Sequence, residues 1–380
     1  MAAPLRLAIV AHRVQRNDGQ GRVNYELARA ALTDGMEVTL LAAHCAEDVA
    51  SHPRARFVQL GKESRPTQFW RNLAFADDAT RWLRKNRSSV DVVQANGFIT
   101  WEPCDLVAMH FVHTSWLGSP FYPFRHSMRP YALYQRAFTA LNSRWEKRAV
   151  RSARLVVAVS AIMAREVQAL GVAEEKVRTV PNGVDVEEFT PGATERATWD
   201  LPQDVPLVLF AGDIRSPRKN LITLLKALQE APEVHLVVAG AVAGSPAPAQ
   251  AQQLGIAERV HFLGKTDRMA SLMRSADLFV FPSLYEPYGL VVAEAMASGL
   301  PVIASRHVGC TSVFQGALEV IRNAEDPAEL AQRIRALLNN PERRRELSTT
   351  GRERALEVSW NETTAAYLRI VRELASTRQG

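Results

Sequence analysis

The apolar positions of the chain alternate between short continuous runs and longer segments with helical spacing. Continuous runs of four to eight apolar residues are typical of strands buried on both faces of a parallel sheet. The strands predicted in this way are 5–10, 36–43, 57–60, 90–95, 106–110, 155–160, 177–180, 207–211, 234–239, 260–264, 276–281 and 301–304. Helices are predicted at 22–33, 68–84, 161–170, 220–230, 269–275, 290–297, 327–339, 341–356 and 360–375. This order predicts an α/β fold.

The alternation is interrupted once, at 187–204, and then starts again. This segment contains Pro191, Gly192 and Pro202, and such residues are typical of a linker between domains. Residues 241–251, rich in Ala, Pro and Gly, predict a loose loop. We therefore predict two domains, 1–188 and 189–359, followed by a terminal helical segment, 360–380.

The stretch 276–299 predicts a strand, a loop and a helix. Pro282 and Pro287 break the backbone after the apolar run, Gly289 permits a positive φ, and a helical pattern then continues to Gly299. The loop lies at the carboxyl end of its strand and at the N-terminus of its helix. Ligands of open α/β sheets bind at this position, and anionic ligands are favoured there.

Two carboxylates bracket this loop, Glu286 before the helix and Glu294 about one turn inside it. A carboxylate accepts two hydrogen bonds from vicinal hydroxyls, so the pair suits a sugar or a ribose. The alternative is a solvated helix residue and a charge at a helix N-terminus. The small apolar neighbours of Glu294 argue against simple exposure.

Three further segments carry candidate binding residues. Arg215, Arg218 and Lys219 precede a helix for which Asn220 is the predicted N-cap, an arrangement that suits a diphosphate. The loop 11–21 contains Gly19 and Gly21, but it lacks the GxGxxG and P-loop patterns. His110 ends its predicted strand, and His113 follows in a loop. Either His110 contacts a ligand at this edge or it is a structural hydrogen-bond donor.

Residues 121–154 combine aromatic rings with positive charge. Eight arginines and lysines lie between seven aromatic residues, and Glu146 is the one acidic residue of the stretch. The pattern fits an anionic membrane surface, an anionic acceptor or nucleic acid. A core-packed helix with a basic outer face explains it equally well.

Composition narrows the class of protein. The 380 residues are 47% hydrophobic and 23% charged, with a net charge of +6, as in an ordinary globular protein. No apolar run approaches the roughly 20 residues of a membrane span, and the N-terminus is read as a first strand rather than a signal peptide. Cys45, Cys104 and Cys310 are isolated, so we expect no disulfide framework, no zinc site and a cytoplasmic location.

Five motifs in order resemble one enzyme family over nearly the whole chain. They are Glu286-Pro-Tyr-Gly-Leu-Val-Val-Ala-Glu294, Pro181-Asn-Gly-Val-Asp185, the Gly19–Gly21 loop with the later DGMEVTLL, the segment RVHFLGKTD, and the terminal SWNETTAAYLRIVREL. The chain resembles the retaining nucleotide-sugar glycosyltransferases of family 4. The resemblance implies the GT-B fold, in which two Rossmann-like domains face each other across a central cleft. It also implies that the terminal helix packs on the first, acceptor-side domain.

The resemblance also implies roles for individual residues. Glu286 binds donor-sugar hydroxyls, Glu294 holds the ribose, and the backbone of Tyr288, Gly289 and Leu290 meets the distal phosphate. Lys219 and an arginine neutralise the diphosphate. The remaining candidates are Gly264 and Lys265 at the base, Gly21 at the phosphates, His110 at the donor sugar, and Asn182. The family usually has an arginine where this chain has Asp213, so Arg215 or Arg218 takes its place, and Asp213 orients an arginine or a substrate hydroxyl.

These roles imply transfer of a hexose, with retention, from a nucleotide-diphosphate sugar to a hydroxyl acceptor. We expect front-face transfer without a metal or a cofactor, at the inner face of a membrane. The expected acceptor is a cell-envelope glycan, such as a lipopolysaccharide, a glycolipid or a lipid-linked precursor, and we expect no nucleic-acid partner. The alternatives are a sugar-nucleotide epimerase, a phosphorylase or a catalytically silent nucleotide-sugar-binding scaffold, since a fold does not fix a function.

Overall fold

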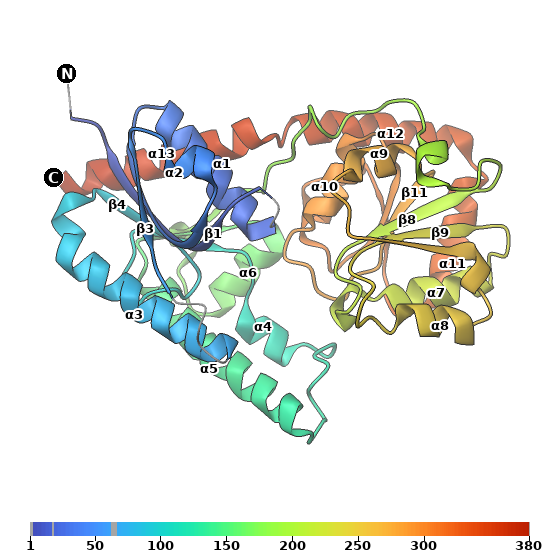
Figure 1. Ribbon diagram of the computed structural model, residues 1–380, viewed down its shortest axis with the longest axis horizontal. Helices are drawn as coiled ribbons and strands as arrows, with labels where there is room; N and C mark the ends of the chain where they lie inside the picture. The colour runs from blue at the N-terminus through green and yellow to red at the C-terminus, as the bar shows by residue number, and fades with distance from the viewer. Residues whose placement is uncertain (1–2, 17–18, 62–66, 380) are drawn as a thin grey trace. The chain divides into compact units, whose positions relative to one another are not determined.

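The chain folds into two compact units, which the computed structural model describes over residues 3–16, 19–61 and 67–379 (Figure 1). Unit 1 comprises Met1–Gly183 and Trp360–Gly380, and unit 2 comprises Val184–Ser359. The sequence predicts the first boundary at 188/189, slightly after the observed one. The segment predicted as a linker therefore lies within unit 2.

Unit 1 is built on a seven-stranded parallel sheet with the strand order β3-β2-β1-β4-β5-β6-β7. Since the order reverses between β1 and β4, the loops that leave these strands diverge at the carboxyl edge of the sheet. Its strands are β1 (Arg6–Val14), β2 (Glu37–Cys45), β3 (Ala55–Gln59), β4 (Val92–Asn96), β5 (Leu106–Met109), β6 (Leu155–Ala158) and β7 (Val177–Thr179). Its helices are α1 (Gly19–Thr33), α2 (Glu47–Ala50), α3 (Gln68–Asn86), α4 (His113–Gly118), α5 (Pro130–Ser152), α6 (Ala161–Ala169) and α13 (Trp360–Gln379).

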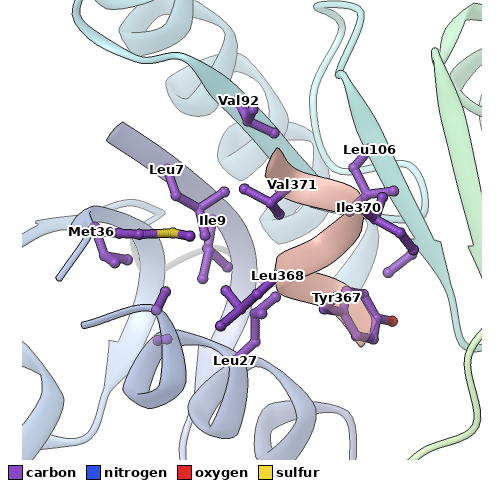
Figure 2. Packing of buried hydrophobic residues seen from close by; sticks show 14 of the residues in the cluster. Leu7, Ile9, Leu27, Met36, Val92, Leu106, Tyr367, Leu368, Ile370 and Val371 are labelled. Carbon is purple, nitrogen blue, oxygen red and sulfur yellow. The ribbon is translucent and has the colours of Figure 1, made fainter. Parts of the chain in front are cut away.

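The terminal helix α13 completes the core of unit 1, although it is far from that core in sequence. Figure 2 shows Leu368 and Val371 of this helix beside Leu7 and Ile9 of β1, and Val371 is fully buried. Arg154, after α5, donates to the carbonyl oxygen of Leu374 at 3.0 Å. Without α13, the apolar face of the sheet that it covers would be exposed to water, which is the main driving force for its position.

Unit 2 repeats the architecture with six parallel strands in the order β10-β9-β8-β11-β12-β13. The order reverses between β8 and β11. Its strands are β8 (Leu207–Ala211), β9 (His235–Ala239), β10 (Val260–Gly264), β11 (Leu278–Phe281), β12 (Val302–Ser305) and β13 (Glu319–Ile321). Its helices are α7 (Leu221–Gln229), α8 (Ala247–Gln253), α9 (Met269–Arg274), α10 (Leu290–Ala297), α11 (Pro327–Leu338) and α12 (Pro341–Leu356).

Several local predictions differ from the structure, among them the end of the first strand, since β1 continues to Val14 into the predicted loop. Helix α1 begins at Gly19, so Gly19 and Gly21 lie in its first turn rather than in a loop. His113 begins α4 instead of lying in a loop. The predicted loose loop contains α8, whose alanines and glutamines favour a helix despite the prolines around its start. The three-residue edge strand β13 was not predicted, because so short a run carries no periodicity.

Candidate functional site

In unit 2, the loops that follow β8 and β11 meet where the strand order reverses. The carbonyl oxygen of Arg218, in the first loop, accepts hydrogen bonds from Leu284 N at 2.8 Å and from Ser283 Oγ at 3.0 Å, both in the second loop. The motif residues predicted from the sequence therefore come together at the position where open α/β sheets bind ligands.

A cluster of three charged side chains lies between these loops. Lys219 Nζ pairs with Glu286 Oε2, and Arg218 Nη1 lies 3.4 Å from the same oxygen. Arg218 also donates to the carbonyl oxygen of Tyr285 at 2.7 Å. The cluster carries two positive charges and one negative charge, and its net positive charge suits an anionic ligand.

The pKa of Lys219 is lowered, chiefly because the ammonium group is buried. The carboxylate of Glu286 opposes this effect by stabilising the charged form of Lys219. Lys219 is thus a buried lysine paired with one carboxylate, that of Glu286. A buried cation is electrostatically stronger than an exposed one because water screens it less.

Asn220 links the loops around this cluster through its side chain, a role that the sequence did not predict. It occupies the N-cap position of α7 but makes no capping hydrogen bond, and its backbone is left-handed with φ of 58°. Its Nδ2 donates to the carbonyl oxygens of Pro282 at 3.0 Å and Ala324 at 2.6 Å. The side chain therefore ties the lysine loop to the loop after β11. The signal in the sequence was the asparagine itself, which tolerates a left-handed backbone.

Asp213, the residue that departs from the family pattern, is paired with Arg215. Arg215 Nε lies 2.8 Å from Asp213 Oδ1, and both side chains are about half exposed. The hydrogen bond from Arg215 lowers the pKa of Asp213. Of the two candidate arginines, Arg218 lies with Lys219 and Glu286, whereas Arg215 is held by Asp213 at the surface.

The start of α10 follows the second loop directly. Gly289 has φ of 97°, and a Cβ atom there would lie 2.8 Å from Val308 Cγ1, so the position requires glycine. The first N–H groups of a helix have no carbonyl partner within it. In α10 this applies to Leu290 and Val291, because Val292 N and Ala293 N donate to the carbonyl oxygen of Gly289. Tyr288 precedes this turn with a buried hydroxyl that has no hydrogen-bond partner among the described residues. Leu290 begins the helix, and Glu294 lies half-buried one turn further.

Gly264 and Lys265 lie at the carboxyl end of β10, two strands away from β8. The carbonyl oxygen of Gly264 accepts a hydrogen bond from Gly240 N at 2.8 Å. Gly264 has a positive φ of 76°, and the side chain of Lys265 is exposed.

The candidates of unit 1 lie at the carboxyl edge of its own sheet. His110 follows β5, and its Nε2 atom is buried without a hydrogen-bond partner among the described residues. Burial lowers the pKa of His110 to about 4, so the imidazole is neutral at pH 7. The buried Asn182 follows β7, and its Oδ1 also has no partner in the described part of the chain. Gly21 is buried in α1, where its carbonyl oxygen accepts from Gln15 N at 3.2 Å.

A buried polar network, missed from the sequence, lies where the strand order of unit 1 reverses. Asn96, at the end of β4, donates to Asn24 Oδ1 of α1 at 2.8 Å and accepts from Gln94 Nε2 at 2.9 Å. Asn24 donates in turn to the carbonyl oxygen of Arg13 at 3.0 Å. The sequence signal for this network was the presence of polar residues at the end of a buried strand and on the apolar face of a helix, because buried polar groups are usually hydrogen-bonded.

The basic aromatic stretch is partly packed and partly exposed. Trp145 of α5 stacks on Phe69 of α3 with ring centroids 6.0 Å apart. The buried Glu146 accepts from the backbone N of His113 at 3.0 Å and contacts His113 Nδ1 at 2.7 Å, so it joins α4 to α5. In contrast, Met128 is 75% exposed and Tyr131 is 64% exposed. Trp145 and Glu146 therefore pack as the core-packed reading predicts, whereas Met128 and Tyr131 lie at the surface.

None of the helices in the described part of the chain is long and apolar enough to cross a membrane. Within the same residues, no three His, Cys, Asp or Glu side chains lie together as a metal site.

Two family models match the chain, one to each unit. The model described as "Glycosyltransferase Family 4" matches residues 17–188, and the model described as "Glycosyl transferases group 1" matches residues 193–354. A D-inositol 3-phosphate glycosyltransferase of Geodermatophilus obscurus is 32% identical over 360 residues, which cover 85% of this chain and 76% of the relative. The chain spans about half the length of other curated relatives that it matches.

Two solved structures share the fold. Sucrose-phosphate synthase from Thermosynechococcus elongatus superposes with a TM-score of 0.81 at 22% identity, over 98% of this chain and 100% of that one. The Anabaena protein HepE, solved in complex with UDP and glucose, gives a TM-score of 0.70 at 20% identity, over 99% and 100% of the two chains. At this identity the likeness concerns the fold, which is that of GT-B enzymes.

Proposed function

The chain belongs to glycosyltransferase family 4 and has the GT-B fold, and from this premise we propose that it transfers a hexose from a nucleotide-diphosphate sugar to a hydroxyl acceptor with retention of configuration. The observation that carries the proposal is the cluster of Lys219, Arg218 and Glu286 beside the start of α10. A buried lysine, an arginine and free helix N–H groups together suit a diphosphate leaving group.

The proposed chemistry needs charge stabilisation more than a nucleophile. As the glycosidic bond to the diphosphate breaks, negative charge develops on the leaving oxygen and positive charge on the sugar. Fixed donors at the leaving group lower this barrier, and removal of one donor typically costs about 100-fold or more in rate. Because Glu286 is held by Lys219 and Arg218, we assign it to donor-sugar hydroxyls rather than to a covalent intermediate. The leaving phosphate oxygen then accepts the acceptor's proton on the same face.

We propose that no metal ion or cofactor takes part. Lys219 and Arg218 supply the positive charge at the diphosphate that a divalent cation supplies in other transferases. In the same proposal, Glu294 holds the ribose, Gly264 and Lys265 lie at the base, and Tyr288, Gly289 and Leu290 meet the distal phosphate. His110, Asn182 and Gly21 act from unit 1.

The acceptor is proposed to be a hydroxyl of a cell-envelope glycan, a glycolipid or a lipid-linked precursor. The name of the Geodermatophilus relative, which specifies D-inositol 3-phosphate, adds a phosphorylated polyol to these candidates. Met128, Tyr131 and Leu133 are exposed beside Arg125 and Arg129, and such a surface suits peripheral contact with an anionic inner membrane. Sedimentation with anionic vesicles at low salt, but not with neutral ones, is the expected result. Equal recovery with both removes the electrostatic part of this proposal.

The deciding experiment is a screen of the protein against UDP-, GDP-, ADP- and dTDP-sugars without metal. We expect a rise in melting temperature and slow release of nucleoside diphosphate for one donor, since water itself is a poor acceptor. Nuclear magnetic resonance of the released sugar then reports whether the anomeric configuration is retained. Binding without turnover favours a scaffold, and a changed sugar still attached to its nucleotide favours an epimerase. Phosphate-dependent release of a sugar 1-phosphate favours a phosphorylase.

A further inference from the structure

A second pocket lies entirely within unit 1, at the carboxyl ends of β1, β2 and β3. It has a volume of about 220 Å³ and lies against the first turns of α3. Ligand pockets usually measure about 300–1,000 Å³, so this one accommodates one group of a ligand rather than a whole ligand. None of the residues discussed for donor binding lines it.

The charged side chains that line this pocket are positive. Arg13 enters from the end of β1, Arg71 enters from α3, and two histidines lie beside them. Among the described residues, no Asp or Glu lines the pocket, and neither arginine forms an ion pair with a carboxylate. Both guanidinium groups are therefore available for a ligand. The exposed arginines of α3 and its neighbours otherwise tend to pair locally, as Arg81 does with Asp78 at 2.5 Å.

The amide side chains of the pocket bond to each other and to Arg71 in a way that leaves N–H donors for a ligand. Arg71 Nη2 donates to Gln68 Oε1 at 3.1 Å, and Gln68 Nε2 donates to Asn72 Oδ1 at 2.6 Å. This chain of bonds uses both amide oxygens as acceptors, and the amide hydrogens of Asn72 have no acceptor among the described residues. Two arginines and an amide donor in one pocket favour a group with several acceptor oxygens.

The floor of the pocket is apolar. Phe75 is buried, and its ring lies 4.6 Å from the ring of His12, centroid to centroid. Gly61 closes the side at the end of β3 with φ of 74°, and a Cβ atom there would lie 3.3 Å from Phe75 Cδ2. The basic groups thus line a hollow with an apolar floor.

We propose that this pocket is a subsite for a phosphomonoester group carried by the acceptor. A phosphomonoester has three acceptor oxygens and a charge of about −1.5 to −2 at pH 7, which matches two arginines and an amide donor. The inference rests on the proposed function, because it assigns the group to an acceptor of that reaction. It makes the acceptor a phosphorylated polyol, either free in solution or displayed as a lipid headgroup.

The test is direct binding, which requires no turnover. The full-length protein is titrated calorimetrically with glucose 6-phosphate, with glucose and with UDP. Arg13→Gln and Arg71→Gln are each expected to weaken the binding of glucose 6-phosphate about tenfold or more and to leave that of UDP unchanged. Arg54→Gln is the matched control, because it removes an exposed arginine just before β3, at the opposite edge of the same sheet.

Vesicle binding distinguishes the two sources of the group. The same variants are sedimented with vesicles that contain phosphatidic acid, a lipid phosphomonoester, and with phosphatidylcholine vesicles. A loss for both pocket variants that is confined to glucose 6-phosphate indicates a soluble acceptor, and a loss confined to phosphatidic acid indicates a lipid acceptor. Unchanged binding of both probes by both variants overturns the subsite. Because UDP binding is measured separately, that outcome is distinguishable from failure of the donor site.

Discussion

The ammonium group of Lys219 pairs with the carboxylate of Glu286, and only 13% of each side chain is exposed. The pair joins the loop after β8 to the loop after β11, at the reversal of strand order in unit 2. Removal of one partner of a buried pair leaves an uncompensated charge, which is usually more costly than replacement of both. The two residues therefore act together, and the Glu286 carboxylate favours the charged form of Lys219.

Glu286→Gln is expected to lower the pKa of Lys219 further. Burial already lowers this pKa, and the Glu286 carboxylate partly restores it. Without that carboxylate, the ammonium form is lost at a lower pH, so the alkaline limit of nucleoside diphosphate binding moves to lower pH. Calorimetric titrations between pH 7 and 10 measure this limit.

Asp213→Asn is the control for this experiment. Asp213 also favours the charged form of Lys219, but it is the weakest of the contributions, so its removal shifts the limit by less. An alkaline limit that is unchanged or raised in Glu286→Gln would show that Lys219 does not govern diphosphate binding.

Arg218, rather than Arg215, is expected to replace the family's phosphate arginine. Arg218 lies 3.4 Å from Glu286 Oε2, whereas Arg215 is bound to Asp213 at the surface. Arg218→Ala should lower the rate of diphosphate release about 100-fold, while Arg215→Ala should change it only a few-fold. Steady-state rates of the two variants with the same donor decide between them. A larger loss in Arg215→Ala would reverse the assignment.

The sequence predicted the elements of this site better than it predicted its contacts. The buried strands have continuous apolar runs, and Pro282, Pro287 and Gly289 mark the turn between β11 and α10, so strand, loop and helix followed from residue type. The pairing of Arg218 with Glu286 joins residues 68 positions apart. Such a pairing depends on the order of strands in the sheet, which local patterns do not specify.

Asn220 shows why local rules were insufficient within the site. An asparagine before a helix is usually read as an N-cap, and here it occupies that position. Its side chain instead bonds two carbonyl oxygens from distant loops, because those buried acceptors would otherwise lack a partner. The same limit applies to α13: its apolar pattern was visible, and its packing on the first domain was expected only from the family resemblance.

Gly289→Ala is expected to destabilise unit 2 and to weaken donor binding. A left-handed residue other than glycine costs about 1–3 kcal/mol, and the added Cβ would lie 2.8 Å from Val308 Cγ1. Gly316→Ala is the matched control, since Gly316 has φ of 84° but open space around it. Thermal unfolding should show a larger loss for Gly289→Ala, and only this variant should bind nucleoside diphosphate more weakly. Equal losses would mean that the contact with Val308 relaxes.

The pair of His235 and His261 is expected to make unit 2 less stable in acid. Their rings stack 5.4 Å apart, and burial lowers the pKa of each below its ordinary value of 6.5, with Arg259 adding to the effect at His235. The unfolded chain therefore binds more protons than the folded chain below about pH 6.5, so the free energy of unfolding falls as the pH falls through that value.

His261→Phe tests this dependence. It removes one titrating group and relieves its partner, so the free energy of unfolding should fall less between pH 7 and pH 5 than in the wild type. Denaturant titrations at both pH values give this difference. Replacement of the exposed His126 by Gln is the control and should leave the difference as it is. A fall as steep in His261→Phe as in the wild type would place the acid sensitivity elsewhere.

Tyr367→Phe is expected to stabilise unit 1. Tyr367 of α13 lies in the core of unit 1 and is 1% exposed (Figure 2), and its hydroxyl has no hydrogen-bond partner among the described residues. A buried polar group without a partner costs about 1–3 kcal/mol, so its removal should raise the free energy of unfolding by about 1 kcal/mol.

Tyr25→Phe is the matched change in the same core, because the hydroxyl of Tyr25 donates to Asp48. That variant should lose stability, since a hydrogen bond to a charged group contributes about 1.5–3 kcal/mol. Denaturant titrations of both variants give the two signs, and a loss in Tyr367→Phe comparable to that in Tyr25→Phe would mean that a bound water satisfies the Tyr367 hydroxyl.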